Sequence, residues 1–542
     1  MMKNKRYTIL TAMLLVACTV FAQQAAPALG EYRYDDATQL WRLTDNAAGL
    51  GIDTTRNRGF AQIGYEHHSG DYHRVQEGSR TNQLRFETER YQKIGRYLYG
   101  YGRFDFDYGR TNNRTWCDVR RPYNSNPYFS GSAIMGKYDF QDFNFTAALA
   151  STAIRQWHFG LRLDYNVGDL SRLRDPRPRS QTLEYKITPA VTFTFGRNTF
   201  GISGNYHRRK EKIDGIKTVQ TDATITYYDM TGMEHATGTV SGYSGYKREW
   251  VDHRFGAELS YGYKSEPYHL LATASIERGS EGILGQYKKE EGKFVDYRYG
   301  FTLRNRLKTN GMLHELDFLL GYEQAYADEY RQKFYSENND EKESKTFTYE
   351  MRDASGNIIK KDSTITKTLP YTSQYYVTQL VMKKRYQVKV FHTDLHYRLN
   401  FITAQRINAY VGTRFTTYDA KNKYLLPESS LHYDAYDLTF EGGAGLLKHR
   451  LWIDGGFTMH FNGKAELSLS DATTDYAKGV LLPDMAFYGA NYVKGSLRVT
   501  YNFPVTIKRK RTMWYASGYG DWLRSNNNLH AASVGFTLGI WN

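Results

Sequence analysis

Three side chains with acid–base or metal-binding chemistry alternate along one short stretch of the sequence. His392, Asp394 and His396 are each separated by one residue. In a strand they would share a face, with about 6.6–7 Å between neighbours, so that Asp394 could touch either histidine. A metal site or an acid–base site would still need further groups from adjacent strands. We therefore interpret this group as structural.

The rest of the sequence offers little else for catalysis. Asp105 and Asp107 could form a carboxylate pair, but Arg103 beside them predicts a salt bridge instead. No Gly-x-Ser-x-Gly elbow, phosphate-binding loop or His-Glu-x-x-His motif occurs in the sequence. We predict no catalytic residues, no metal and no cofactor, with a hydrolase kept as an alternative function.

The elements that carry these residues are predicted from a period of two in the apolar side chains. From Trp157 to Gly168 every odd position is apolar or aromatic, and every even position is polar or glycine. A strand needs about 9–11 tilted residues to cross a membrane, and these stripes are that long. About 18 of them occur between residues 57 and 541. Ambiguity at 132–141, 372–383 and 511–522 leaves a range of 14–18.

The connections and the composition favour a membrane barrel over a soluble sheet protein. Short turns alternate with long polar loops, notably 111–141, 212–251 and 330–385. The predicted fold class is therefore all-β, a transmembrane antiparallel β-barrel with short periplasmic turns and long extracellular loops. A mean hydropathy of −0.65 excludes a bundle of membrane helices. A large exported sandwich or propeller is the alternative fold.

One hairpin predicts its own register. If Asn310-Gly311 forms the turn, Leu303 faces Phe318 on the apolar side. The same register places opposite charges together on the polar face, in the pairs Arg306 with Glu315, Arg304 with Asp317, and Arg298 with Glu323. A turn at Arg197-Asn198 would likewise place Phe195 opposite Phe200.

Aromatic residues indicate that the apolar face looks outward. Several of them lie beside short turns on the apolar face, where a membrane barrel has its interfacial girdle. These residues are Trp157, Tyr261, Tyr263, Tyr268, Phe401, Tyr501 and Phe503. The polar face would then line the lumen.

Residues 1–22 have the three zones of an export signal: a basic start, an apolar core and a cleavage site at Val20-Phe21-Ala22. A lipoprotein site at Cys18 is the alternative. With Cys18 removed, Cys117 is the only cysteine of the chain, so no internal disulfide can form. The expected organisation is 1–22 signal peptide, 23–56 periplasmic N-terminal segment or hatch, and 57–542 barrel.

Taken together, the signal, the strand pattern and the terminal segment Val534–Asn542 resemble those of a Gram-negative outer-membrane β-barrel protein. The resemblance implies the outer membrane as location. Such barrels usually end in an aromatic residue, whereas here Trp541 is penultimate and Asn542 is last.

A second resemblance lies in residues 23–56. Asp36 is expected to cap a short helix carrying Leu40, Trp41 and Leu43. The run Asn46–Leu50 is similar to a signature of the long-chain fatty acid transporter family, with Ala47 in place of its proline. In that family the N-terminal segment forms a hatch inside the barrel, which makes Trp41, Asn46 and Gly49 hatch candidates. The alternative is a periplasmic lead-in at the barrel mouth.

The predicted lumen carries both signs of charge in nearly equal numbers, which does not favour an ion-selective pore. The lumen-lining candidates are Arg298, Arg304, Arg306, Glu315, Asp317, Glu323, Arg162, Asp164, Arg398 and Asp394. These charges either lock a plugged barrel or line a wet path for small solutes. Much of the net charge of +15 then falls in loops and turns, including Arg172, Arg208, Arg209, Lys210 and Lys212.

We predict a channel or transporter for small molecules in the outer membrane. Its basic loops would contact lipopolysaccharide, and nucleic-acid binding is not expected. Two alternatives remain open, a barrel hydrolase and a non-transporting surface barrel that binds a partner through its long loops. Within loop 330–385, segments 346–351 and 358–365 flank Ser355-Gly356-Asn357 and predict a hairpin above the membrane.

Overall fold

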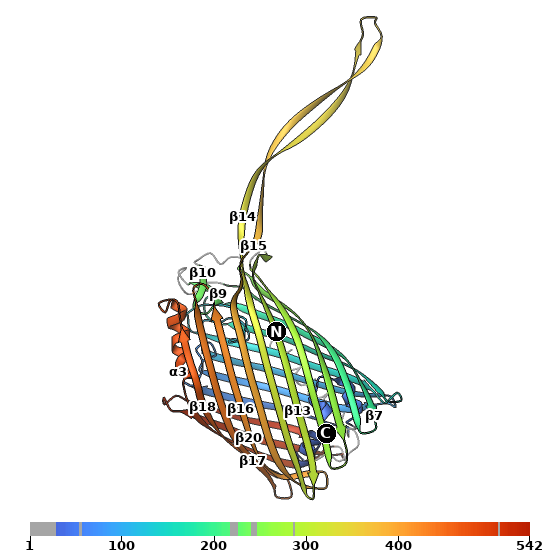
Figure 1. Ribbon diagram of the computed structural model, residues 1–542, viewed down its shortest axis with the longest axis vertical. Coiled ribbons are helices and arrows are strands. Elements are labelled where there is room, and N and C mark those ends of the chain that lie inside the picture. Colours follow the sequence, from blue (N-terminus) through green and yellow to red (C-terminus); the bar gives the residue numbers. More distant parts are fainter. Residues whose placement is uncertain are drawn as a thin grey trace.

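The computed structural model describes residues 29–53, 57–216, 226–239, 246–285, 288–507 and 510–541. Within them, 18 antiparallel strands form one closed barrel (Figure 1). Successive strands pair with each other, and the first closes the barrel against the last through the Phe60–Trp541 row. This confirms the predicted fold class. The predicted signal and Cys18 lie outside the described residues.

The barrel strands are β1 (Arg58–Gly70), β2 (Arg80–Ile94), β3 (Leu98–Arg114), β5 (Gly136–Ser151), β6 (Trp157–Arg172), β7 (Arg179–Phe195), β8 (Asn198–Asp214), β11 (Arg248–Lys264), β12 (Tyr268–Leu284), β13 (Glu290–Thr309), β14 (Met312–Arg352), β15 (Ile358–Thr403), β16 (Arg406–Tyr424), β17 (Ser429–Leu446), β18 (Leu451–Ser468), β19 (Tyr492–Ile507), β20 (Lys510–Ser525) and β21 (His530–Trp541).

The predicted register of the Asn310-Gly311 hairpin is confirmed. Thr309 pairs with Met312 and Leu303 with Phe318, and Gly311 has a φ of +74°. The prediction for the β7–β8 hairpin was wrong by two residues, because Phe195 pairs with Asn198 and Phe200 faces Phe193. The turn centres on Gly196, whose φ of +59° is available to glycine without steric cost.

The apolar face of the strands looks outward. Phe255 and Leu259 on β11 are 62% and 61% exposed, and many other large apolar side chains of the wall are exposed in the same way. At the short-turn end, aromatic rings pair on this face, as Trp157 does with Phe193. A closed antiparallel barrel with an apolar outer band and aromatic rim crosses an outer membrane. Within the described residues, no helix is both long enough and apolar enough to span a bilayer.

A long hairpin projects from one end of the barrel (Figure 1). It is the continuation of β14 and β15, whose pairing runs outward to Arg352 and Ile358 around the turn at Gly356. This confirms the predicted hairpin within loop 330–385. Because short turns lie at the opposite end, the hairpin end is the extracellular one.

The extracellular mouth is covered by folded loops. Residues 115–135, named the mouth loop here, include the short strand β4 (Ser130–Gly131), which joins β9 (Tyr227–Gly232) and β10 (His235–Thr239) in a small sheet. The helical turns η4 (Ala477–Leu481) and α3 (Leu482–Tyr488) lie at the same end (Figure 1). Trp116 packs between Tyr228 and Tyr476 and so joins the three parts.

Residues 29–53, named the N-terminal segment here, lie inside the barrel at the short-turn end (Figure 1, dark blue). They form α2 (Leu29–Thr38) and the 3₁₀ turns η1 (Leu40–Leu43) and η2 (Ala47–Gly51). The expected cap at Asp36 was wrong. Asp36 lies within α2 and pairs with Arg58, and Gln39 precedes η1 without a side-chain cap.

Candidate transport path

Glycines of the inner wall make room for the N-terminal segment. A Cβ on Gly160 would lie 2.1 Å from the backbone nitrogen of Ala48, which is closer than any real contact. Cβ atoms on Gly201 and Gly262 would lie 3.1 Å and 3.0 Å from the Trp41 ring. All three glycines are at lumen-facing positions of their strands. The wall is therefore shaped to receive this segment.

The hatch candidates form the centre of this contact. Trp41 is buried with Leu40 against Leu271 of the wall. Asn46 accepts a hydrogen bond from the Ala48 backbone N–H at 3.1 Å and so caps η2. Gly49 packs against Trp41, since a Cβ there would lie 2.7 Å from the Trp41 Cβ.

Ion pairs hold the segment to opposite sides of the wall. The Arg33 guanidinium donates to both carboxylate oxygens of Asp454, at 2.7 and 2.8 Å. Asp45 pairs with Lys186 at 2.7 Å and with Arg162 at 3.3 Å. Burial opposes ionisation of Asp45, but these two cations keep its pKa below the ordinary value.

The C-terminal end of α2 receives a cation from the wall. Its last turn has no basic residue, and Arg306 Nε donates to the Ala37 carbonyl oxygen at 2.7 Å. A positive charge at this end complements the helix dipole and satisfies a free carbonyl. Arg304 similarly donates to the Leu43 carbonyl oxygen at 3.2 Å.

Asp53 closes the segment on itself. Its carboxylate accepts hydrogen bonds from the backbone N–H groups of Trp41 at 2.7 Å and Arg42 at 3.3 Å. Burial raises the pKa of Asp53 to about 6, although Lys264 and the two N–H groups act in the opposite direction.

The lumen-lining candidates divide into two groups. Those near the N-terminal segment are Arg162, Asp164, Arg304, Arg306, Glu315 and Asp317; Arg306 contacts Asp317 at 2.6 Å and Glu315 at 3.3 Å. Arg304 lies opposite Asp317 in register but turns to Leu43, because Arg306 takes that carboxylate. The others pair along the wall: Arg298 with Glu323 at 3.4 Å, Arg398 with Glu441 at 2.6 Å, and Asp394 with Arg414 at 3.1 Å.

The residues considered above for acid–base or metal chemistry contact separate partners. His396 contacts Glu441 at 2.9 Å, and Asp394 contacts Arg414, so Asp394 joins neither histidine. Arg103 pairs with Asp105 at 3.0 Å, as its position beside that residue predicts.

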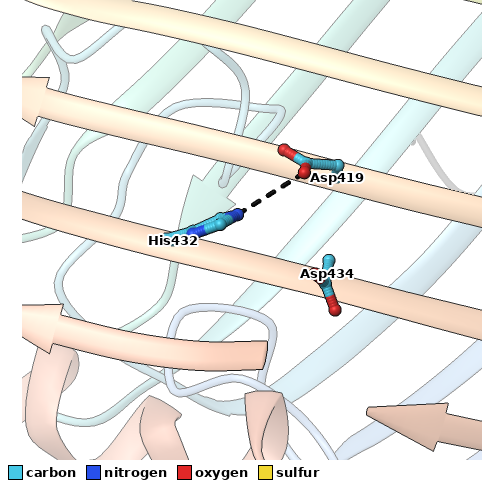
Figure 2. Close-up of side chains that lie close together, drawn as sticks. All are labelled: Asp419, His432 and Asp434. Carbon is cyan, nitrogen blue, oxygen red and sulfur yellow. Dashed lines mark hydrogen bonds and ion pairs between the residues drawn. The ribbon is translucent and has the colours of Figure 1, made fainter. Parts of the chain in front are cut away.

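Sequence analysis missed one group with metal-ligand chemistry. Asp419, His432 and Asp434 on β16 and β17 have ligand atoms within 4.8 Å of one another (Figure 2). Tyr418 and Ala420 line a cavity inside the barrel, so Asp419 between them faces the outer surface. His432 already contacts Asp419 at 3.4 Å. This group lies outside the lumen.

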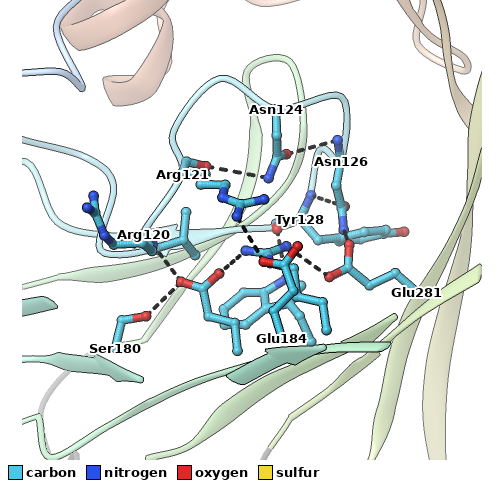
Figure 3. A network of polar contacts seen from close by, with 12 residues as sticks. Arg120, Arg121, Asn124, Asn126, Tyr128, Ser180, Glu184 and Glu281 are labelled. Atoms are coloured by element: carbon cyan, nitrogen blue, oxygen red, sulfur yellow. Dashed lines mark hydrogen bonds and ion pairs between the residues drawn. The ribbon is translucent and has the colours of Figure 1, made fainter. Parts of the chain in front are cut away.

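A polar network ties the mouth loop to the wall (Figure 3). The Arg120 backbone N–H donates to Glu211, and the Arg121 guanidinium to Glu184 at 2.9 Å. Asn126 Nδ2 donates to Glu281 at 2.6 Å. Because charged side chains of several strands hold the mouth loop, this loop is fixed to the barrel wall where it lies over the mouth.

Cavities remain along the lumen, and two of them concern the proposed path. One of about 320 Å³ lies beside Arg33 of the N-terminal segment and is bordered by Gln62, Arg85 and Tyr515. The other, of about 460 Å³, lies under the mouth loop. The lumen between the mouth loop and the N-terminal segment therefore still holds space.

Solved structures that match this chain include three proteins named for iron uptake. The FrpB iron transporter from Neisseria meningitidis is 10% identical, with a TM-score of 0.37 over 92% of this chain and 83% of that chain. The ferric yersiniabactin uptake receptor FyuA from Yersinia pestis is 9% identical, with a TM-score of 0.35 over 90% and 80%. The ferric citrate transporter FecA is 7% identical, with a TM-score of 0.38 over 90% and 79%. Similarities this distant carry no cargo over to this chain.

One family model matches most of the chain. It is described as "Family of unknown function (DUF6850)" and matches residues 47–542. No curated protein matches the chain.

Proposed function

This chain belongs to the family of unknown function DUF6850, and we propose that it is an outer-membrane transporter for small molecules in which residues 29–53 act as a hatch. The observation that supports this most is the fit of that segment to glycines in the wall, at Gly160, Gly201 and Gly262. A barrel of this strand number is wide enough for an aqueous channel unless something fills it.

The contacts between residues 29–53 and the barrel wall are mainly polar, which supports release of this segment from the wall. Arg33, Asp45 and Arg306 hold it through ion pairs and hydrogen bonds that water can replace when they separate. Arg406 adds a pair with Glu31 at 2.6 Å at the rim. Apolar contact is confined to small clusters around Trp41, Tyr34 and Tyr32.

Solute entry into liposomes tests this function. The purified protein is compared with a variant lacking residues 29–53, and swelling is measured in an uncharged pentose. We expect fast swelling only without the segment. A variant lacking hairpin residues 331–379 serves as the control and should behave like the native chain. Equal, slow swelling of all three would contradict the proposal.

The projecting hairpin favours a second function, binding of a partner at the cell surface. One face of its tip gathers apolar side chains: Phe347, Tyr349 and Met351 alternate on β14, and on β15 Ile359 pairs with Met351 and Ile365 with Lys345. These side chains are 40–62% exposed. Photocrosslinking from position 347 in intact cells should give one discrete adduct, and no adduct would count against this role.

The outer wall also carries basic residues suited to anionic lipid. On β8, Arg208, Lys210 and Lys212 continue the outward face beyond Phe200 and Ile202. Two of the predicted basic residues turn inward instead: Arg209 contacts Glu281 at 3.5 Å, and Arg172 donates to Ser132 at 2.9 Å. We propose that the outward group contacts lipopolysaccharide phosphates. Native mass spectrometry should show bound lipopolysaccharide that Arg208→Glu removes, and undiminished binding would refute the contact.

A further inference from the structure

The inner wall changes character near the extracellular end of β15–β18. Deeper in the barrel it carries charged side chains such as Arg398 and Glu441. Under the mouth loop it presents Val388, Leu431 and Leu467 instead. An apolar stretch inside an otherwise polar lumen lowers the free energy of the protein only when something apolar covers it.

The covering is incomplete and leaves a cavity of about 460 Å³. Mouth-loop residues from Val119 to Phe129 form its roof, and Leu481, Phe487 and Tyr488 of the helical turns form one side. This volume lies within the range of small-molecule sites, which are lined mainly by apolar and aromatic groups with a few polar ones.

Tyrosines supply both ring faces and free hydroxyls to this cavity. Tyr386, Tyr418, Tyr433 and Tyr488 all line it. The Tyr433 ring lies 4.9 Å from Tyr488 and 6.0 Å from Tyr418. Among the described residues, no hydrogen bond involves the hydroxyl of Tyr386, a side chain that is 7% exposed, or that of Tyr418, which is 42% exposed. Both hydroxyls are therefore available to a bound molecule, and a buried phenol such as that of Tyr386 usually finds a hydrogen-bond partner.

The charges around the cavity are already matched. Arg74 pairs with Glu77 at 2.5 Å, and Arg121 pairs with Glu184 at 2.9 Å. The Arg74 guanidinium also lies 3.9 Å from the centre of the Tyr123 ring, where it occupies the place of a cationic ligand. The Asp484 carboxylate also lines the cavity, and it accepts one hydrogen bond on each oxygen, from the Val75 backbone N–H at 2.8 Å and from the Tyr123 hydroxyl at 2.5 Å. A cation would therefore find a carboxylate that is already hydrogen-bonded beside Arg74, and an anion would find no unpaired arginine. The surroundings therefore select an uncharged molecule.

We propose that this cavity binds an uncharged organic molecule with a ring and hydroxyl or similar acceptor groups at its edge. The ring stacks against the tyrosines over the apolar wall, and the edge groups accept hydrogen bonds from Tyr386 and Tyr418. The site lies on the path of the proposed transporter. Binding to it does not require the N-terminal segment to move, so it is measured separately from transport.

Saturation-transfer NMR on the purified full chain tests the site, in a detergent without a sugar headgroup. The probes are phenyl β-D-glucoside, benzoate and phenyltrimethylammonium, which share a ring and differ in charge. We expect binding of the glucoside and much weaker signals from the two ions. Absence of glucoside binding at millimolar concentration, or stronger binding of either ion, overturns the proposal.

Two variants locate the probe. Ala420→Trp places an indole in the cavity and should abolish glucoside binding, while Thr416→Trp, deeper on the same lumen-facing row, should leave it unchanged. Tyr418→Phe keeps the ring and removes one hydrogen bond, so we expect about fivefold weaker binding. Unchanged affinity in both Ala420→Trp and Tyr418→Phe overturns the site. If the variant without residues 29–53 gives no fast liposome swelling while these binding results hold, the proposed transport function is wrong and the binding site stands.

Discussion

At the scale of single residues, docking of the N-terminal segment depends on glycines of the barrel wall, because a larger side chain at these positions would collide with the segment. Gly160→Ala would force a Cβ to within 2.1 Å of the Ala48 backbone. Overpacking of this kind costs about 1–3 kcal/mol. In this variant the cost weakens the docking of residues 29–53 against the wall. We expect faster trypsin cleavage after Arg33 and Arg42 in detergent. Gly102→Ala is the matched control, because a Cβ there meets nothing within 4 Å.

Asp53 should make docking depend on pH. Its pKa is about 6 when docked, because of burial, and near the ordinary 3.8 when exposed. The contribution of Asp53 to docking is therefore largest below pH 4 and falls by about 3 kcal/mol as the pH rises past 6. Hydrogen exchange of amides 40–53, corrected for intrinsic rates, should accelerate across this window. Asp53→Asn keeps an acceptor for the Trp41 N–H and should flatten the profile; a steep profile in the variant would refute this assignment.

The inward orientation of each charged lumen residue could be predicted from the sequence. The position of the N-terminal segment could not, and the glycines of the inner wall were the residues that marked it. Alternation places Arg162 and Arg306 on the inner face, since every second side chain points the same way. Nothing local says that Arg306 meets α2 or that Gly262 lies under Trp41. The one sequence feature that could have located this contact is a glycine at a lumen-facing position near a short turn, in a strand whose other lumen-facing residues are charged.

At the scale of elements, the projecting hairpin should be independent of the barrel. Beyond Tyr330 its rows pair only with each other, as Tyr335 does with Tyr375. Replacing residues 331–379 by a two-residue turn should leave the barrel's heat-modifiable gel migration intact and its melting temperature within a few degrees. Loss of the folded band would show that the hairpin contributes to barrel stability.

The strands were predictable because lipid on one face and the lumen on the other impose the same alternation of apolar and polar side chains on every strand. Register was predictable at Asn310-Gly311, where the turn residues and the pairs Leu303–Phe318 and Arg306–Glu315 agree. It failed at the β7–β8 turn, because shifting by two residues preserves the faces and only Gly196 distinguishes the registers. The mouth loop and the 3₁₀ turns have no such pattern, since their shape follows from distant contacts.

At the scale of the whole molecule, each end of the barrel holds a folded segment, and the covering at the extracellular mouth is incomplete. The mouth loop is held by side chains of several strands, including Glu184, Glu211 and Glu281. The N-terminal segment is held at the other end by pairs such as Arg33 with Asp454. The mouth loop continues directly into the barrel strands β3 and β5 on either side, whereas residues 29–53 precede the first strand and can leave without breaking the sheet.

Planar-bilayer current tests this account most directly. The native protein should stay nearly silent, the variant without residues 29–53 should conduct in large steady steps, and Gly160→Ala should open intermittently. Steady conduction by the native protein, as large as that of the shortened variant, would contradict the claim that this segment closes the lumen.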